Sequence, residues 1–142
     1  MTALSLSARR RVHAPVHEIW RALTEPEALS EWYAPGCRWE IEGLGSGSLV
    51  RFFNTATDVQ TAVVEHADPP RLLVLRWRYD VDGAPVSLLN AFALTPAGDE
   101  TEVIVRQEGY ESLPTSMRAQ WLEQDQGAVD AIASALEAYV ER

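Results

Sequence analysis

The feature that most constrains this chain is a long stretch in which apolar and polar side chains alternate along the sequence. The alternation begins at residue 38 and continues to residue 109. It predicts strands at 38 to 43, 48 to 54, 58 to 67, 71 to 79, 86 to 95 and 100 to 109. The intervening segments GLGSGS, ADPPR, DVDGAP and TPAGDE are short and rich in turn-forming residues, as in hairpins. An antiparallel meander is therefore expected.

The segments before this stretch add one strand and two short helices. Residues 3 to 13 alternate as a strand, and Pro15 suits the first position of a helix. Thr24 and Glu27 have the spacing of a capping box, which predicts the start of a second helix. The positions expected to face the core are Leu4, Leu6, Ala8 and Val12 in the strand, with Arg10 on the same side, and Val16, Ile19, Trp20, Leu23, Ala28, Leu29 and Trp32 in the helices.

The last segment returns to helical spacing over residues 115 to 141, and an interruption near Gly127 stays open. Its predicted apolar face consists of Met117, Trp121, Ala128, Ile132, Ala135, Leu136 and Tyr139. The order of strand, two short helices, further strands and long helix predicts an α+β fold. In such a fold one helix lies across a curved antiparallel sheet.

Length and cysteine content place the chain in a broad class. We expect a single domain over residues 1–142, which is long enough to bury a substantial core. Cys37 is the only cysteine, so no internal disulfide can form, and a reducing compartment is favoured. No run approaches the ~18 apolar residues of a membrane span, and the first 15 residues lack a signal-peptide pattern. We therefore predict a cytoplasmic protein without integral membrane association.

The charge of the chain argues against nucleic acid as a partner. Its 12 basic and 21 acidic side chains give a formal charge of -9, which opposes binding to phosphate backbones and anionic lipids. The basic cluster Arg9, Arg10 and Arg11 lies inside a strand pattern and has no second cluster to extend it. No nucleic-acid binding is expected.

Three motifs resemble a known family. The stretch HAPVHEIWRALTEPEALSEWY is similar to the APxxxVWxALTDPexLxxWW pattern of START-like (SRPBCC) domains. PPRLLVLRW and ETEVIVRQEGY resemble the PPxrLvfTW and gTxvtlxxxG patterns of the branch named after activators of the heat-shock protein 90 ATPase. The resemblance implies a helix-grip fold, with a seven-stranded curved antiparallel sheet around a long C-terminal helix. It also implies a cavity that holds apolar ligands in many relatives, and homodimers, which are common among them.

The chain departs from this family pattern in its last helix. Relatives commonly carry Gly-Trp there, whereas this chain has Gly127-Ala128. If Ala128 faces inward, the missing indole leaves a larger cavity or a space that another side chain fills. Trp121, two turns earlier, is the expected filler.

Two amide side chains fall on otherwise apolar faces of the predicted sheet. Asn90 shares a face with apolar residues of the strand at 86 to 95, and Gln107 does so in the strand at 100 to 109. A buried amide without a partner costs about 1–3 kcal/mol, so each must bond to a neighbour, to trapped water or to a ligand. In the strands at 48 to 54 and 58 to 67 the alternation does not identify an inner face.

We predict that a small apolar or aromatic molecule binds between the sheet and the last helix. Aromatic side chains would supply contact area, and the two amides would orient the ligand. No cofactor is expected. Trp20 is assigned to the core, whereas Trp32 is placed at the mouth of the cavity. The predicted ligand-binding residues are Trp32, Tyr33, Trp39, Trp77, Asn90, Phe92, Gln107, Met117 and Trp121.

Two alternative functions stay open. The branch name suggests a co-chaperone-like interaction protein, and other START-like branches suggest a polyketide cyclase or hydrolase, which would need an acid or base near the ligand. The nearest candidates for such a group are Tyr79, Glu108, Tyr110 and His66, but alternation places Glu108 outward. We predict no catalytic residue.

Metal and thiol chemistry are also not expected. His13 and His17 have metal-like spacing but no further ligand completes the set, so no metal site is predicted. Cys37 lies next to Arg38 without a motif around it and is assigned an inert role.

Overall fold

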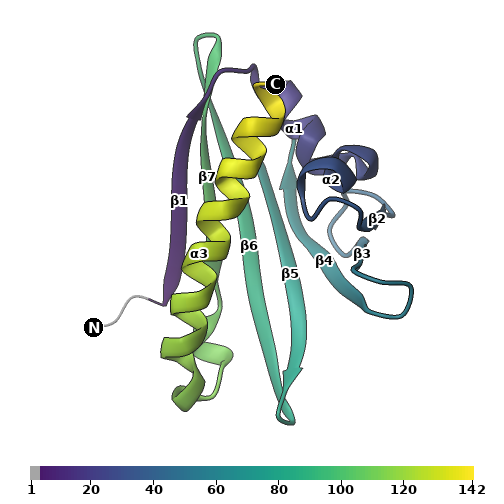
Figure 1. The fold of residues 1–142 in the computed structure, drawn as a ribbon, viewed down its shortest axis with the longest axis vertical. Helices are drawn as coiled ribbons and strands as arrows, with labels where there is room; N and C mark the ends of the chain where they lie inside the picture. The colour runs from purple at the N-terminus through teal and green to yellow at the C-terminus, as the bar shows by residue number, and fades with distance from the viewer. Residues whose placement is uncertain (1–3) are drawn as a thin grey trace.

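A seven-stranded antiparallel sheet curves around the long helix α3 in the computed structural model, which describes residues 4–142 (Figure 1). The strand order is β1-β7-β6-β5-β4-β3-β2, so β1 and β7 are neighbours. The elements are β1 (Ser5–Val12), α1 (Val16–Thr24), α2 (Pro26–Trp32), β2 (Arg38–Ile41), β3 (Leu49–Phe53), β4 (Val59–Asp68), β5 (Leu72–Val81), β6 (Ala84–Ala97), β7 (Glu100–Glu108), the 3-10 turn η1 (Tyr110–Ser112) and α3 (Thr115–Val140). The predicted α+β fold class is confirmed. Ala3, which the predicted first strand includes, lies outside the described residues.

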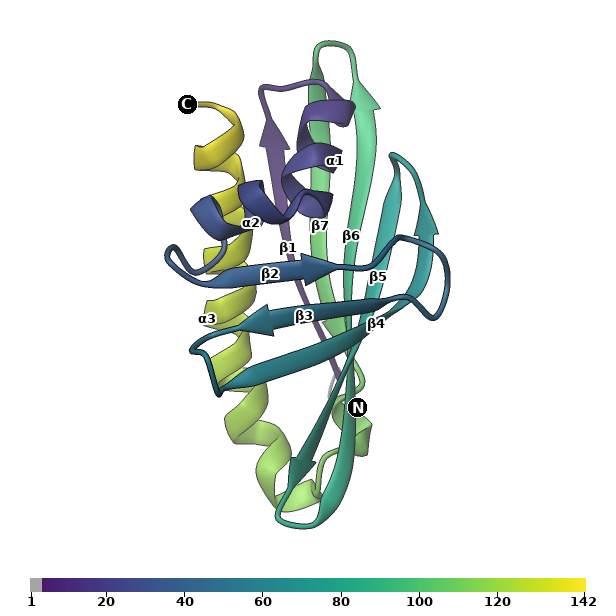
Figure 2. The same cartoon turned by 90° about the vertical axis from the view of Figure 1, so that its right-hand side faces the viewer.

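The sheet bends strongly across its width. Figure 2 shows β2, β3 and β4 running across the molecule, whereas β1, β7 and β6 run along its length. α3 packs mainly on β1 and β7, and α2 packs against β2 and α1. The short helices therefore close one end of the curve, and the middle of the sheet faces α3. No helix within residues 4–142 is both long and apolar enough to span a membrane.

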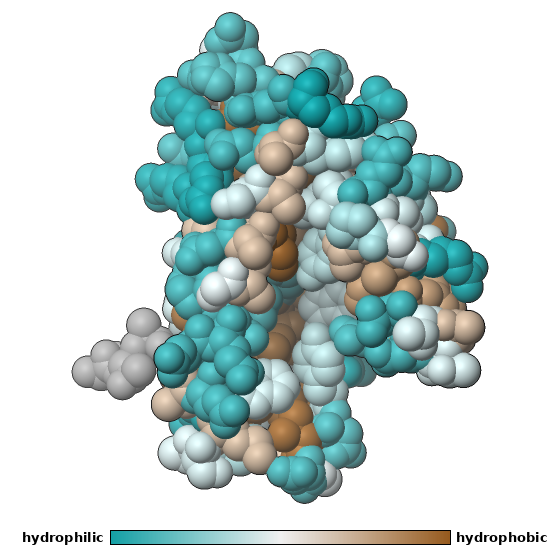
Figure 3. Space-filling view, in the orientation of Figure 1, coloured by the Kyte–Doolittle hydropathy of each residue, from teal (hydrophilic) through white to brown (hydrophobic). Residues whose placement is uncertain are grey.

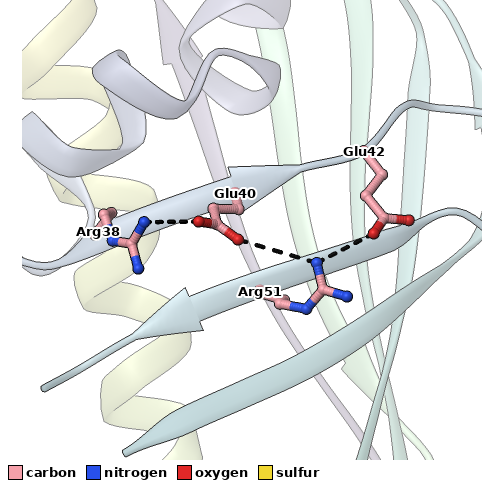
Figure 4. Close-up of polar contacts among 4 residues, drawn as sticks. All are labelled: Arg38, Glu40, Glu42 and Arg51. Carbon is pink, nitrogen blue, oxygen red and sulfur yellow. Dashed lines mark hydrogen bonds and ion pairs between the residues drawn. The ribbon is translucent and has the colours of Figure 1, made fainter. Parts of the chain in front are cut away.

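Charged side chains of β2, of β3 and of Glu42, which directly follows β2, lie together (Figure 4). Arg38 donates to Glu40 at 2.6 Å, and Arg51 donates to Glu42 at 3.1 Å and lies 3.9 Å from Glu40. Because β2 is an edge strand, these charges discourage pairing with another chain. Trp39 alternates with them and is buried, as the alternation predicts.

β3 and β4 are the strands for which the sequence does not identify an inner face. Phe52 packs against the core, whereas Phe53 lies beneath the guanidinium of Arg38, 3.9 Å from the ring centre. In β4 the register shifts at a β-bulge between Val64 and His66. A bulge changes which side of the sheet the following residues face, so β4 has no single alternating pattern.

α3 is one continuous helix, so Gly127 does not interrupt it. Its buried residues are Val129, Ala133 and Leu136, whereas Ala128 is exposed. The prediction that Ala128 belongs to the buried face of the helix is therefore wrong, because the next residue, Val129, is buried instead. The helix buries the line that meets β1 and β7, and Ala128 lies on the adjoining face beside the open middle of the sheet.

The predicted capping box at the start of α2 is wrong. Glu25 precedes this helix, and no side chain among the described residues caps it. Thr24 instead ends α1, and its hydroxyl donates a 2.8 Å hydrogen bond to the carbonyl oxygen of Trp20. Pro26 begins α2. Proline is tolerated there because a backbone N–H in the first turn of a helix has no acceptor within the helix.

The core consists of a main cluster and a smaller one. The main cluster gathers residues of α1, α2, the sheet and the C-terminal half of α3. The smaller cluster, at the other end of the sheet, contains Val86, Leu88, Tyr110 and Leu113. The cavity described below takes lining residues from both clusters and therefore lies between them.

Candidate functional site

A cavity of about 170 Å³ lies between the curved sheet and α3. Figure 3 shows a hollow beside α3 with apolar side chains in its depth. Every strand from β2 to β7 contributes to the lining, and α3 forms the opposite wall. The lining residues are Tyr33, Trp39, Phe52, Gln60, Trp77, Tyr79, Leu88, Asn90, Gln107, Asp125, Ala128 and Ile132.

Four aromatic rings form one wall of this cavity. The ring centres of Trp39 and Phe52 are 4.9 Å apart, those of Tyr33 and Trp39 are 5.1 Å apart, and those of Trp39 and Trp77 are 6.3 Å apart. The pairs of Trp39 with Tyr33 and Trp77 meet edge to face, an arrangement that the ring quadrupoles favour. Trp39 is the centre of this wall.

Two polar side chains on the lining have unused hydrogen-bonding capacity. Trp39 is 5% exposed, and its buried Nε1 has no acceptor among residues 4–142. Asn90, also 5% exposed, donates only one long bond from Nδ2, 3.4 Å to the carbonyl oxygen of Arg106. A buried donor without an acceptor costs about 1–3 kcal/mol. The described residues therefore leave one donor of a cavity-lining residue unsatisfied.

A hydrogen-bonded group of three residues joins β7, η1 and α3 at the other side of the cavity. The hydroxyl of Tyr110 donates to Oδ2 of Asp125 at 2.8 Å. Nε2 of Gln107 donates to the same Oδ2 at 3.3 Å and to the Tyr110 hydroxyl at 2.9 Å. Gln107 is thus bonded inside the protein, and these bonds fix the position of the Asp125 side chain on the cavity lining.

The tyrosines around the cavity are held in their neutral form. Burial is the first cause that raises the pKa of Tyr79 to about 12, and the nearby charges of Tyr33 and Asp125 act in the same direction. Burial also raises the pKa of Tyr33. For Tyr110, burial and then the hydrogen bond to Asp125 raise the pKa. At neutral pH these hydroxyls can donate hydrogen bonds but are poor general bases.

A small apolar space of about 20 Å³ adjoins the cavity toward α1 and α2. It shares Tyr33, Trp39, Trp77 and Asn90 with the cavity, and Phe92 is among its further lining residues. This volume is close to that of a single water molecule. This space could hold one small substituent of a ligand bound in the cavity, but it is too small for a second ring.

An apolar groove of about 310 Å³ runs on the surface between the end of α2 and α3. It shares Tyr33, Ala128 and Ile132 with the cavity. These three residues therefore separate the groove from the cavity. The groove is lined by Trp32, Tyr33, Ala34, Ala128, Ala131, Ile132 and Ala135.

The structure brings five of the nine predicted ligand-binding residues together on the cavity lining. These are Tyr33, Trp39, Trp77, Asn90 and Gln107. Phe92 lines only the small adjoining space, and Trp32 lines only the groove. Whether any of them binds a ligand stays a prediction.

The other predicted residues lie elsewhere. Met117 and Trp121 are on the N-terminal part of α3 and are absent from the cavity lining. Trp121 packs edge to face on Tyr79 at 6.4 Å and contacts the smaller core cluster. Ala128 lines the cavity, whereas Trp121 does not. The prediction that Trp121 fills the space beside Ala128 is therefore wrong.

Both N-terminal tryptophans take part in packing the core. Trp32 is buried, and its Nε1 donates to the carbonyl oxygen of Ala22 at 2.8 Å, which fastens α2 to α1. Trp20 is half-buried and packs against the main cluster. At the cavity, the place predicted for Trp32 is occupied by its neighbour Tyr33.

Sequence reasoning missed Phe52, Gln60, Leu88, Ile132 and, above all, Asp125 as lining residues. A signal for Asp125 was present. Trp121, Asp125, Ala128 and Ile132 follow one another at spacings of four, three and four, so Asp125 is a charged residue within an apolar helical stripe. Phe52 had no such signal, because β3 contains adjacent apolar residues of both parities.

The remaining acid, base and metal candidates lie away from the cavity or are engaged. His66 and Glu108 are not on its lining. His13 pairs with Glu100, at 2.8 Å from Nδ1 to Oε2, and His17 is exposed. Among residues 4–142, no three His, Cys, Asp or Glu side chains gather as a metal site. Cys37 is half-buried, with Sγ 3.7 Å from Oδ1 of Asn54.

Comparisons with solved structures identify the same fold in several bacterial proteins. Protein MLL2253 from Mesorhizobium loti is 19% identical, with a TM-score of 0.81 and 97% of each chain covered. CalU16 from Micromonospora echinospora is 23% identical, with a TM-score of 0.73 over 96% of this chain and 73% of that one. The Aha1 dimer from Colwellia psychrerythraea is 17% identical, with a TM-score of 0.71 over 98% and 97%. At these identities the likeness concerns the fold alone.

No curated protein matches the chain. The family model described as "Activator of Hsp90 ATPase homolog 1-like protein" matches residues 13–141, nearly the whole sequence. The helix-grip architecture and the motifs of the N-terminal helices agree with this assignment to a family. The chain belongs to the family of Activator of Hsp90 ATPase homolog 1-like proteins.

Proposed function

We propose that this protein binds a small apolar or aromatic molecule in the cavity between the sheet and α3. The cavity combines an aromatic wall with a few polar groups, which is the usual composition of small-molecule sites. The groove that adjoins it at Tyr33, Ala128 and Ile132 offers a route from the surface.

The volume of the cavity limits the size of the ligand. Sites for drug-sized molecules span roughly 300–1,000 Å³. An engineered apolar cavity of about 150 Å³ accepts benzene. At about 170 Å³, this cavity suits a molecule with one ring and a short substituent. A long lipid chain would not fit without movement of α3 or Tyr33.

The buried N–H of Trp39 is the observation that carries the proposal. This donor lies on a residue that lines both the cavity and its small extension, and the described residues supply no acceptor for it. A ligand oxygen or neutral nitrogen that reaches this N–H would recover the lost hydrogen bond. A trapped water would do so as well, but a ligand that displaces it changes the environment of the indole.

The test follows the indole N–H resonances of the full chain by NMR while benzyl alcohol is added. We expect the Trp39 resonance to shift with a dissociation constant on the order of 1 mM or tighter, as suits a ligand of eight heavy atoms. Trp32 is the internal control, because its N–H is already bonded to Ala22. A Trp39→Phe variant assigns the resonance.

A second variant checks the location. Ala128→Phe places a ring where the cavity meets the groove and should abolish the shift while the chain stays folded. If Trp39 and Trp32 shift equally, or if neither responds to a series of ring-sized molecules, ligand binding in this cavity is contradicted.

The family description suggests a second candidate, interaction with the Hsp90 chaperone. The apolar groove between α2 and α3 is the observation that favours it, because an apolar groove on the surface can receive an apolar side chain of a partner. Stimulation of Hsp90 ATPase by the wild-type chain, lost in an Ala131→Glu variant of the groove, would support this function. A flat response to the wild-type chain would remove it.

Two other readings of the family stay proposals for this chain. The Colwellia psychrerythraea relative is described as a dimer, so homodimerisation is worth measuring by sedimentation. A cyclase- or hydrolase-like activity would have to use Asp125 or Tyr79, the ionisable groups within the cavity besides Tyr33. The pKa of Tyr79, about 12, makes it suitable only as a hydrogen-bond donor at neutral pH.

A further inference from the structure

Asp125 supplies the formal charge on the lining of the cavity. No arginine or histidine is among the lining residues, and the chain contains no lysine. None of the ion pairs formed among residues 4–142 involves Asp125. The carboxylate therefore faces the cavity without a protein cation to neutralise it.

The carboxylate is held in place through only one of its oxygens. Oδ2 accepts the hydroxyl of Tyr110 and Nε2 of Gln107, and Tyr110 is fully buried. Among the described residues, no donor reaches Oδ1. Asp125 is thus an oriented acceptor with one oxygen to spare, fixed by a group that the core holds rigidly.

The aromatic wall favours the same kind of ligand as the carboxylate. The faces of indole, phenol and phenyl rings attract cations, and indole does so most strongly. Trp39 and Trp77 line the cavity together with Asp125. A bound ligand that displaces water from the cavity would strengthen both attractions, because they act more strongly in a less polar surrounding.

We propose that the cavity selects ring-sized organic cations whose ammonium group donates to Oδ1 of Asp125 while the apolar body packs against Trp39 and Trp77. This inference rests on the proposed ligand-binding function and adds the charge of the ligand. Because an ammonium group accepts no hydrogen bond, the acceptor for Nε1 of Trp39 would be a second polar group of the ligand or a water molecule. An anion of equal size would bring a like charge beside Asp125. A neutral molecule would lack the stronger, charge-assisted hydrogen bond.

The test compares three probes that share a phenyl ring and one polar substituent: benzylamine, benzyl alcohol and benzoate. Each is titrated into the full chain at neutral pH, with the Trp39 indole resonance as the readout. We expect benzylamine to bind at least about tenfold more tightly than benzyl alcohol, and benzoate to bind most weakly.

Asp125→Asn removes the charge but keeps the size and an oxygen that can accept from Tyr110. It should weaken benzylamine binding by about tenfold and change benzyl alcohol binding by less than about twofold. Asp130→Asn is the matched control, because Asp130 is an exposed aspartate on the same helix. It changes the net charge equally and should leave all three affinities unchanged.

The outcomes separate this inference from the proposed function. Equal binding of the three probes, or a preference for benzylamine that survives Asp125→Asn, overturns the selection of cations but leaves ligand binding intact. Binding of none of them contradicts the proposed function itself. The comparison on the wild-type chain decides the inference even if the Asp125→Asn variant fails to fold.

Discussion

The hydroxyl of Tyr110 donates a 2.8 Å hydrogen bond to Oδ2 of Asp125 and thereby ties the segment after β7 to α3. Because Tyr110 is fully buried and its partner is a carboxylate, Tyr110→Phe should lower the free energy of unfolding by about 1.5–3 kcal/mol. Tyr79→Phe is the control, since the Tyr79 hydroxyl forms no hydrogen bond among the described residues, and it should cost less than about 1 kcal/mol. Urea unfolding of both variants measures the difference, and equal losses would contradict it.

The two N-terminal tryptophans should differ in their contribution to stability. Trp32→Phe removes the hydrogen bond to Ala22 and leaves unfilled space in the core, so we expect a loss of about 2 kcal/mol. Trp20→Phe trims a half-buried ring and should cost less than about 1 kcal/mol. Chemical unfolding followed by circular dichroism measures the two losses of stability. A larger loss for Trp20→Phe than for Trp32→Phe would contradict this prediction.

Two glycines should respond to alanine with opposite signs. Gly109 has a φ of 104°, and a Cβ there would overlap the carbonyl oxygen of Ser87, so Gly109→Ala should destabilise the chain by at least about 2 kcal/mol. Gly127 lies within α3 with no atom near its added Cβ, so Gly127→Ala should stabilise it by about 0.5–1 kcal/mol. Thermal unfolding of both variants gives the signs, and a shift of both in the same direction would refute this interpretation.

Stability should fall at alkaline pH because of Tyr79. Its pKa rises from 10.0 to about 12 on folding, so the folded chain binds more protons than the unfolded chain between these values. The stabilisation is complete below pH 10 and is lost as the pH passes through 12, with a magnitude on the order of 2 kcal/mol. The raised pKa values of Tyr33 and Tyr110 act in the same direction.

Urea unfolding at a series of alkaline pH values tests this dependence. Tyr79→Phe should retain more of its stability over the same window than the wild-type chain does. Ultraviolet absorption of tyrosinate gives an independent reading, and a Tyr79 that ionises at the ordinary value would contradict the proposed burial effect.

The fold was largely predictable from the sequence, because alternation and helical spacing reflect which side of each element is buried. The prediction failed where a local feature changed that relation. The bulge after Val64 reversed the alternation in β4, and the position of α3 over β1 and β7 shifted its buried line from Ala128 to Val129.

The site was less predictable than the fold. Alternation places Asn90 and Gln107 on the inner face, but Gln107 turns out to be bonded to Tyr110 and Asp125, which come from later segments. Such a group depends on how η1 and α3 return to the sheet, which no pattern within one element encodes. Trp121 illustrates the same limit, since its place depends on contact with Tyr79 across the sheet.

The pairing of β1 with β7 also has a consequence for how the chain acquires its structure during synthesis. Ser5 lies opposite Glu108, so the first strand has no neighbour in the sheet until the chain has been made as far as β7. Contacts of such sequence separation slow folding, because a long loop must close before they form. The meander from β2 to β7 can assemble hairpin by hairpin, whereas β1 and α3 must join it last, as the step that completes the cavity.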